Sequence, residues 1–107
     1  MPTVYIPSRS GHDFSAAKKF GEICYLSGDH AVDPYKTNSI YCLFANILRN
    51  STADDYILIT GLSVMSAIAT AIMARKHGKV NMLIYHASSG GYKARTISID
   101  EMIGSIK

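Results

Sequence analysis

Apolar residues in this chain switch repeatedly between the spacing of a strand and that of a helix, and this alternation constrains the fold most strongly. Short runs rich in β-branched and aromatic residues stop at Pro or Gly. Between these runs, apolar residues recur three and four positions apart, as on one face of a helix. Strands that alternate with helices require right-handed crossovers and form a mainly parallel sheet. The pattern therefore predicts an α/β domain.

The expected elements follow the order β-α-β-α-β-α-β-β-α. Strands are expected at Thr3–Ile6, Glu22–Ser27, Asp55–Thr60, Val80–Tyr85 and Lys93–Ile99. Helices are expected at Phe14–Gly21, Asn38–Arg49, Ser63–His77 and Glu101–Ile106. The unbroken apolar runs in the third and fourth strands are typical of central strands buried on both faces, and the alternation in the fifth predicts a hairpin partner. We expect a Rossmann-like three-layer sandwich, in which a mainly parallel four-strand sheet carries an antiparallel edge strand.

Length and composition predict one domain, residues 1–107, because 107 residues suit a single core and 48% hydrophobic residues exclude disorder. The net charge of +3 favours an anionic ligand and leaves nucleic acid open as a partner. The longest uncharged apolar run, Leu62–Ala74, is too short to span a bilayer, and no signal peptide is recognisable. We therefore expect a cytoplasmic protein (host cytoplasm for a viral one) without a membrane partner. Cys24 and Cys42 lie in apolar stretches and are expected to be buried thiols.

Glycines and polar residues gather directly after the expected strands, where open parallel sheets bind their ligands. Each of the four strand-end segments, residues 8–13, 27–30, 60–63 and 86–91, contains glycine and a hydroxyl group. This composition suits phosphate, because glycine allows close approach of backbone N–H groups and helix N-termini add partial positive charge. Thr60–Ser63 is the strongest segment, since a buried strand leads there directly into a long helix. The candidate ligand-binding residues are Arg9, Ser10, Gly11, His12, Asp13, Gly28, Thr60, Gly61, Ser63, His86 and Ser88.

Other chemistry has weaker sequence support. Turns and caps by themselves favour Gly and Ser, and neither the P-loop pattern GxxxxGK[ST] nor the dinucleotide pattern GxGxxG occurs. His12, His30 and His86 with Asp29 would bind a metal only if their loops converge. Their spacing matches no metal-ligand pattern, so neither a metal nor a cofactor is predicted. The tyrosines in strands, Tyr25, Tyr56 and Tyr85, are expected to be structural. One of the tyrosines near loops, Tyr5, Tyr35 or Tyr92, could stack on a base, but three Phe and no Trp leave no evident stacking platform.

Three functions follow from these residues. The first is binding of a phosphate-containing small molecule, a nucleotide, by the strand-end loops. The second is a nucleotide-directed hydrolase or nuclease in which His12 with Asp13, or His86 beside Ser88, moves a proton. The third is a non-enzymatic homo-oligomer or host-protein binder that uses the Ala- and Met-rich helix Ser63–His77. A binding protein is favoured over an enzyme, and no catalytic residue is assigned.

The succession HDFSAAKKFGE, DDYILITGLSVMSAIATAI and ARKHGKVNMLIY resembles short α/β proteins encoded by bacteriophages. The resemblance covers most of the chain but carries no established active-site motif. It implies a small accessory or anti-defence protein that acts inside a bacterial host. In that setting, binding of a host factor or a signalling nucleotide is a better expectation than metabolic catalysis.

Overall fold

One five-stranded sheet organises the computed structural model, which describes residues 1–9, 12–27, 33–60 and 63–99. The strands are β1 (Thr3–Ile6), β2 (Glu22–Tyr25), β3 (Tyr56–Leu58), β4 (Lys79–His86) and β5 (Gly91–Ser98). The helices are α1 (Thr37–Leu48), α2 (Ser63–His77) and the 3₁₀ helix η1 (Ser15–Ala17). The helix expected at Glu101–Ile106 lies outside the described residues. In the described ranges, no helix is both long and apolar enough to cross a bilayer.

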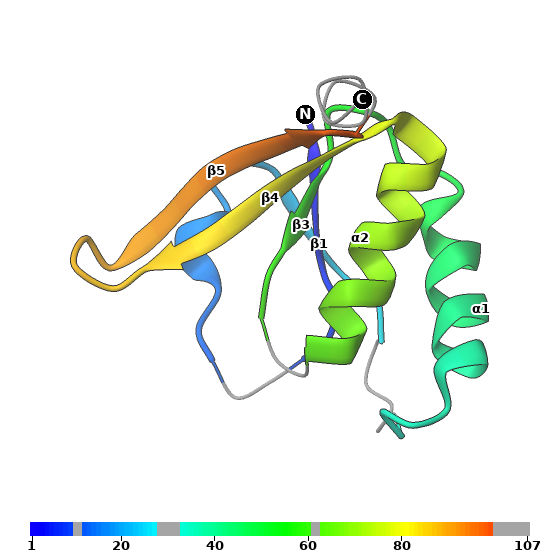
Figure 1. Cartoon of the computed structure of the whole chain (residues 1–107). Coiled ribbons are helices and arrows are strands. Elements are labelled where there is room, and N and C mark those ends of the chain that lie inside the picture. Colours follow the sequence, from blue (N-terminus) through cyan, green and yellow to red (C-terminus); the bar gives the residue numbers. More distant parts are fainter. Residues whose placement is uncertain (10–11, 28–32, 61–62, 100–107) are drawn as a thin grey trace.

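The strand order is β2-β1-β3-β4-β5. The pairs β1–β2, β1–β3 and β3–β4 are parallel, and β5 is antiparallel to β4. The predicted mixed α/β fold, with a mostly parallel sheet and an antiparallel edge strand, is therefore confirmed. After β1 the chain forms β2 on one side of β1, and it then crosses over to form β3 on the other side (Figure 1). The carboxyl ends of β1 and β3 thus flank the point where the strand order reverses, at which α/β sheets bind ligands.

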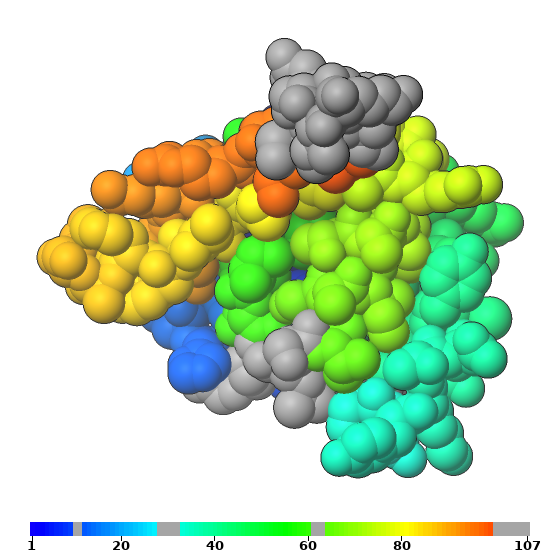
Figure 2. Space-filling model, viewed as in Figure 1, coloured from blue at the N-terminus to red at the C-terminus, as the bar shows by residue number. Residues whose placement is uncertain are grey.

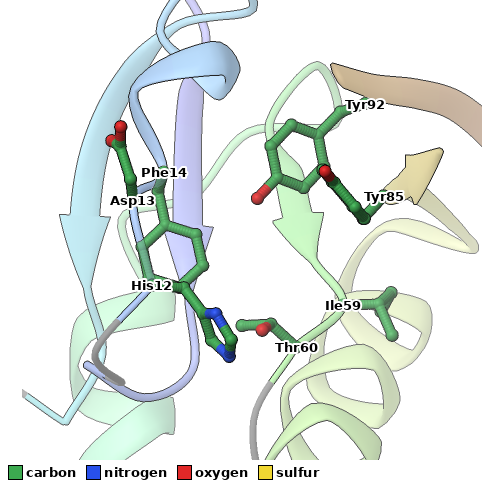
Figure 3. Close-up of a pocket in the computed structure, with 7 residues that line it drawn as sticks. All are labelled: His12, Asp13, Phe14, Ile59, Thr60, Tyr85 and Tyr92. Carbon is green, nitrogen blue, oxygen red and sulfur yellow. The ribbon is translucent and has the colours of Figure 1, made fainter. Parts of the chain in front are cut away.

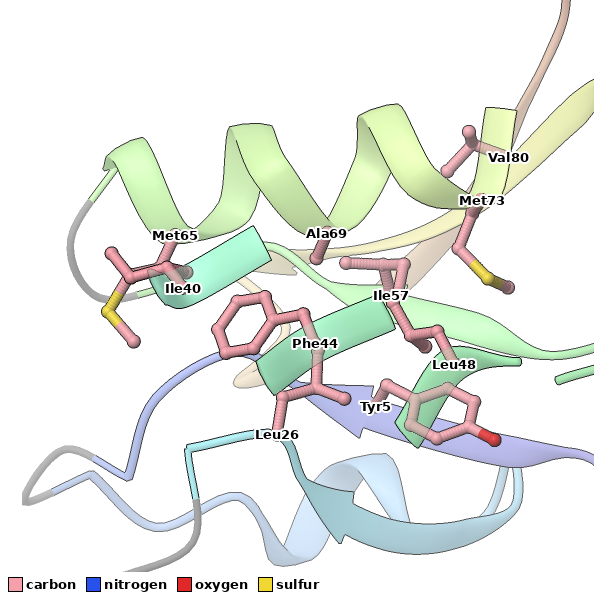
Figure 4. Packing of buried hydrophobic residues seen from close by; sticks show 10 residues of the cluster. All are labelled: Tyr5, Leu26, Ile40, Phe44, Leu48, Ile57, Met65, Ala69, Met73 and Val80. Carbon is pink, nitrogen blue, oxygen red and sulfur yellow. The ribbon is translucent and has the colours of Figure 1, made fainter. Parts of the chain in front are cut away.

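Both α-helices pack on one face of the sheet. In α1, Ile40, Phe44 and Leu48 are spaced four residues apart, so they form one buried stripe. They meet Tyr5 and Ile57 from the sheet, together with the buried residues of α2 (Figure 4). The expectation of two buried thiols is wrong for Cys42, which is exposed because it lies on α1 away from this stripe, and Cys24 on β2 is only half-buried.

The opposite face of the sheet carries η1 instead of the helix expected at Phe14–Gly21. Phe14 and Ala17 pack against Val4, Ile6 and neighbouring strand residues in a second core cluster. A longer helix is prevented because the chain must return to the start of β1, where Glu22 N–H donates to Pro2 O at 3.1 Å. The structure thus shows one layer of α-helices and a three-residue 3₁₀ helix where the sequence predicts a second layer.

The β4–β5 hairpin is longer than the rest of the sheet. β3 pairs with β4 only from Asn81 to Leu83, whereas β4 and β5 pair over eight residues each. The outer end of the hairpin therefore projects as a lobe on the side away from α1 (Figure 2). This overhang carries Tyr85 and Tyr92, which face each other across the two strands.

Side chains at the end of α2 join the two α-helices. Lys76 Nζ donates to the carbonyl oxygens of Leu48 and Ser51 at 3.1 Å each, and also to that of Arg49. His77 Nε2 lies 2.9 Å from Ser51 Oγ. These contacts tie the end of α1 and the turn that follows it to α2, in addition to the backbone hydrogen bond that Leu48 O accepts from Ser51 N–H.

Replacement of Gly21 by Ala is expected to destabilise the protein by about 2–3 kcal/mol, because the added carbon overpacks a backbone contact. A Cβ at Gly21 would lie 2.1 Å from Pro2 O, an atom that already accepts a hydrogen bond from Glu22. Gly91→Ala is the matched control, since a Cβ there meets nothing within 4 Å. Urea unfolding measures both effects, and equal stability of the two variants would contradict the packing argument.

Acidification is expected to weaken the junction of α1 and α2 through His77. The pKa of His77 lies below its usual 6.5, because burial disfavours the charged ring and Lys76 adds repulsion. Below pH 6.5 the unfolded chain therefore binds more protons than the folded chain, and the free energy of unfolding falls. The stability that the neutral His77 ring contributes is fully present above pH 6.5. It is lost as the pH falls through the lowered pKa of His77 in the folded protein.

The measurement is the free energy of unfolding as a function of pH, for the natural protein and for His77→Gln. Glutamine keeps a hydrogen-bonding group near Ser51 but does not titrate. Its profile should be flatter below pH 6.5, the usual value for histidine. Parallel profiles of the two proteins would show that His77 does not contribute.

Candidate functional site

A cavity of about 410 Å³ opens at the carboxyl edge of the sheet, beyond the ends of β1 and β3. The loop after β1 contributes one wall, the end of β3 the floor, and the hairpin overhang the opposite wall (Figure 3). Three of the predicted site residues meet here from segments far apart in sequence. The lining residues are His12, Asp13, Phe14, Ile59, Thr60, Tyr85 and Tyr92.

His12 and Asp13 stand side by side in the chain but point in different directions. The His12 ring is directed toward Thr60, and the Asp13 carboxylate is turned away from both His12 and Thr60 (Figure 3). Asp13 Oδ1 accepts the N–H of Ser15 at 2.9 Å, in a local turn that leads into η1. Hydrogen bonds from Ser15 and the charge of Lys18 hold the pKa of Asp13 below its usual value, so that the carboxylate is ionised at neutral pH.

Tyr85 and Tyr92 form the aromatic wall of the cavity. Their rings make an edge-to-face pair with centroids 5.6 Å apart. Burial raises the pKa of Tyr92, and Tyr85 and the negative charge of Asp13 raise it further, so its hydroxyl remains a hydrogen-bond donor at neutral pH. Tyr85 is 57% exposed, which is more than a structural strand residue requires.

Sequence reasoning missed Phe14, Ile59 and Tyr85 as lining residues. A signal for the tyrosine wall was present, because Tyr85 and Tyr92 lie at equal distances from the turn that joins β4 to β5. A two-residue period then places Leu83 and Tyr85 on the same face of the sheet. No comparable signal existed for Phe14, whose position depends on η1.

The backbone of Thr60 is fixed by two hydrogen bonds to a residue of α2. Ser66 Oγ donates to Thr60 O at 2.9 Å and accepts from Thr60 N–H at 3.3 Å. Ser66 is buried, with 6% of its surface exposed. This double contact fixes the end of β3 against the helix, and the Thr60 side chain is thereby held in the cavity wall.

A second cavity, of about 340 Å³, adjoins the first and shares the wall formed by His12, Asp13 and Phe14. Its remaining lining residues are Ser15, Lys18, Ile23 and Tyr25. The guanidinium of Arg9 lies 4.0 Å from the centre of the Tyr25 ring, a cation–π contact. The positive charges of Arg9 and Lys18 therefore lie on the side of the shared wall away from Tyr85 and Tyr92.

The structure does not bring all candidate residues to this site. Ser10, Gly11, Gly28 and Gly61 lie outside the described residues, as do Asp29 and His30. Ser63 begins α2, and its side chain is not described. Among the described residues, no group of three His, Cys, Asp or Glu side chains is placed to hold a metal ion.

His86 and Ser88 lie at the tip of the hairpin. Because strand residues alternate between faces, His86 points to the face opposite Tyr85 and the cavity. His86 Nδ1 lies 3.0 Å from Ser89 Oγ, and Ser89 Oγ also donates to His86 O. The histidine therefore interacts with Ser89, whereas Ser88 is exposed in the turn.

Removal of the Ser66 hydroxyl is expected to loosen the wall formed by Thr60. Ser66→Ala leaves two backbone groups without their partner, which should cost about 1–3 kcal/mol of stability and speed exchange of the Thr60 amide hydrogen. Thr70→Ala is the matched control, because this hydroxyl bonds only within α2, to Ala67 O. Unchanged exchange at Thr60 in Ser66→Ala would contradict the assignment.

Comparison with known protein families matches residues 2–99 to the family described as Phage Pam3 gp32-like protein. No curated protein and no solved structure matches the chain. The family match spans all five strands and both α-helices. It confirms the resemblance to small phage-encoded proteins, and the chain therefore belongs to the Phage Pam3 gp32-like protein family.

Proposed function

We propose that this protein binds a phosphate-containing small molecule, a nucleotide, in the cavity at the carboxyl ends of its strands. The observation that carries the proposal is the meeting of the β1 and β3 ends with the Tyr85–Tyr92 pair around one cavity. Its volume of about 410 Å³ suits a small ligand, since such pockets commonly measure roughly 300–1,000 Å³. In this proposal the sheet works as a Rossmann-like fold does, with its ligand at the reversal of strand order.

The lining chemistry supports a nucleotide over a simple anion. Aromatic rings accept any nucleobase by stacking, and Tyr85 has the exposed surface that such a contact requires. Hydrogen-bonding groups stand around the rings at His12, Thr60 and the hydroxyl of Tyr92. The adjoining cavity adds a positive charge, because Lys18 is one of its lining residues.

The hydrolase alternative has less support from the described contacts. The Asp13 carboxylate that would orient His12 instead accepts the Ser15 N–H. His86 points away from the cavity, and its partner is Ser89. The alternative of a homo-oligomer or host-protein binder that uses α2 also has less support. Met65 and Met73 are buried against the sheet, so they are not available to a partner.

Membership of a phage-protein family supports a role during infection. We include in the proposal that the protein acts in the host cytoplasm as an accessory or anti-defence factor, and that its ligand is a signalling nucleotide. A homo-oligomer is part of the same proposal. Native mass spectrometry of freshly purified protein measures both the assembly and any nucleotide that it retains.

Tyr85→Ser is expected to weaken nucleotide binding about tenfold or more, because base–aromatic stacking contributes about 1–3 kcal/mol per base. The fold should tolerate this change, since the side chain is 57% exposed. Tyr35→Ser is the matched control: Tyr35 is 91% exposed and does not line either cavity at this edge. Calorimetric titration with a panel of ribonucleotides measures the affinities. Absence of binding by the natural protein, or equal affinities of the two variants, would refute the proposed site.

A further inference from the structure

The two cavities at the carboxyl edge share one wall, and across this wall their lining residues differ in chemistry. Aromatic rings stand at one end, where Tyr85 and Tyr92 pair at 5.6 Å. Asp13 lies between the two ends, because it belongs to the wall that both cavities share, and its carboxylate is turned away from Thr60 toward Ser15 (Figure 3). Lys18 stands at the other end, with Arg9 close by against the ring of Tyr25.

This order matches the three parts of a nucleoside 5′-phosphate. A base needs an aromatic surface, a ribose offers hydroxyl donors, and a phosphate needs cations. A carboxylate is the side chain that accepts hydrogen bonds from two neighbouring hydroxyls at once, as acidic residues do with ribose in dinucleotide-binding folds. A carboxylate repels phosphate, so its position between the two ends suits the sugar alone.

We propose that the site is specific for ribonucleoside 5′-phosphates and that Asp13 distinguishes them from deoxyribonucleotides by accepting hydrogen bonds from the ribose hydroxyls. The base then lies against Tyr85 and Tyr92, and the phosphate lies in the second cavity near Lys18. This inference rests on the proposed nucleotide-binding function and adds the orientation of the ligand and the group that selects its sugar.

Asp13 is held in a state that suits this role. Its Oδ1 accepts the Ser15 N–H at 2.9 Å, which orients the carboxylate. Each carboxylate oxygen has a second lone pair, so the group keeps acceptor sites for a ligand. The charge of Lys18 and the hydrogen bonds from Ser15 stabilise the ionised form, and the pKa of Asp13 is lowered accordingly. A neutral acid or an amide at this position would place a donor where ribose hydroxyls also donate.

The experiment is calorimetric titration of the full chain with adenosine, guanosine, cytidine and uridine 5′-monophosphates, each beside its 2′-deoxy counterpart and its unphosphorylated nucleoside. The natural protein should prefer the ribonucleotide about tenfold, the value of one good hydrogen bond to a charged group. Asp13→Asn should bring this preference close to one. The preference is a ratio of two affinities for the same protein, so a general loss of folded protein cancels from it.

Matched control variants test whether each effect depends on where the charge lies in the structure and not on the loss of a charge alone. Asp54→Asn makes the same change on an exposed turn at the other edge of the sheet and should keep the preference for ribose. Lys18→Gln should weaken the monophosphates about tenfold and leave the nucleosides unchanged. Lys19→Gln, whose natural ammonium lies over the Phe20 ring, should change neither.

The outcomes distinguish this inference from the proposed function. If the natural protein binds no mononucleotide, both fail. If it binds ribo- and deoxyribonucleotides equally, or if Asp13→Asn keeps the preference, nucleotide binding stands and the role of Asp13 is refuted. If Lys18→Gln weakens nucleosides as much as monophosphates, the orientation of the ligand is refuted.

Discussion

The buried carboxylate of Asp55 joins the first strand to the segment that leads into the third. Its Oδ1 accepts Thr3 N–H at 2.9 Å, and its Oδ2 accepts Thr52 N–H at 2.8 Å. Asn81 extends the network by donating to the carbonyl oxygen of Asp55, and Thr96 donates in turn to Asn81. An acid that is 5% exposed is tolerated because backbone donors satisfy it. This network holds the amino ends of β1, β3 and β4 and the carboxyl end of the antiparallel β5 in register.

Register at the amino edge also decides what meets at the carboxyl edge. With β1 beside β3, the loop that carries His12 ends opposite Thr60, which Ser66 holds in place. The longer β4–β5 hairpin then supplies an aromatic wall that a short hairpin could not provide. Asp13 serves two purposes in this arrangement, since it forms the turn that leads into η1 and lies in the wall between the two cavities.

Local patterns predicted most of the fold because hydrophobic period and glycine position are local properties. The bounds of β1 and α2 agree with the prediction, and the other helix and strands of the described chain differ by a few residues at their ends. The helix expected at Phe14–Gly21 is wrong, because the close approach of Gly21 to Pro2 is a tertiary constraint that favours a tight 3₁₀ turn. Of the candidate site, His12, Asp13 and Thr60 converge, whereas His86 points to the other face through strand alternation.

The amino-acid sequence by itself determined the succession of strands and helices, the mostly parallel sheet and the edge at which polar loops gather. It did so because apolar spacing and turn residues act over a few neighbouring positions. Only the tertiary structure decided that Tyr85 and Tyr92 face this edge, that Asp13 turns from His12 toward Ser15, and that Lys18 stands beyond the shared wall. These relations depend on strand register and hairpin length, which bring together residues that are distant in the chain.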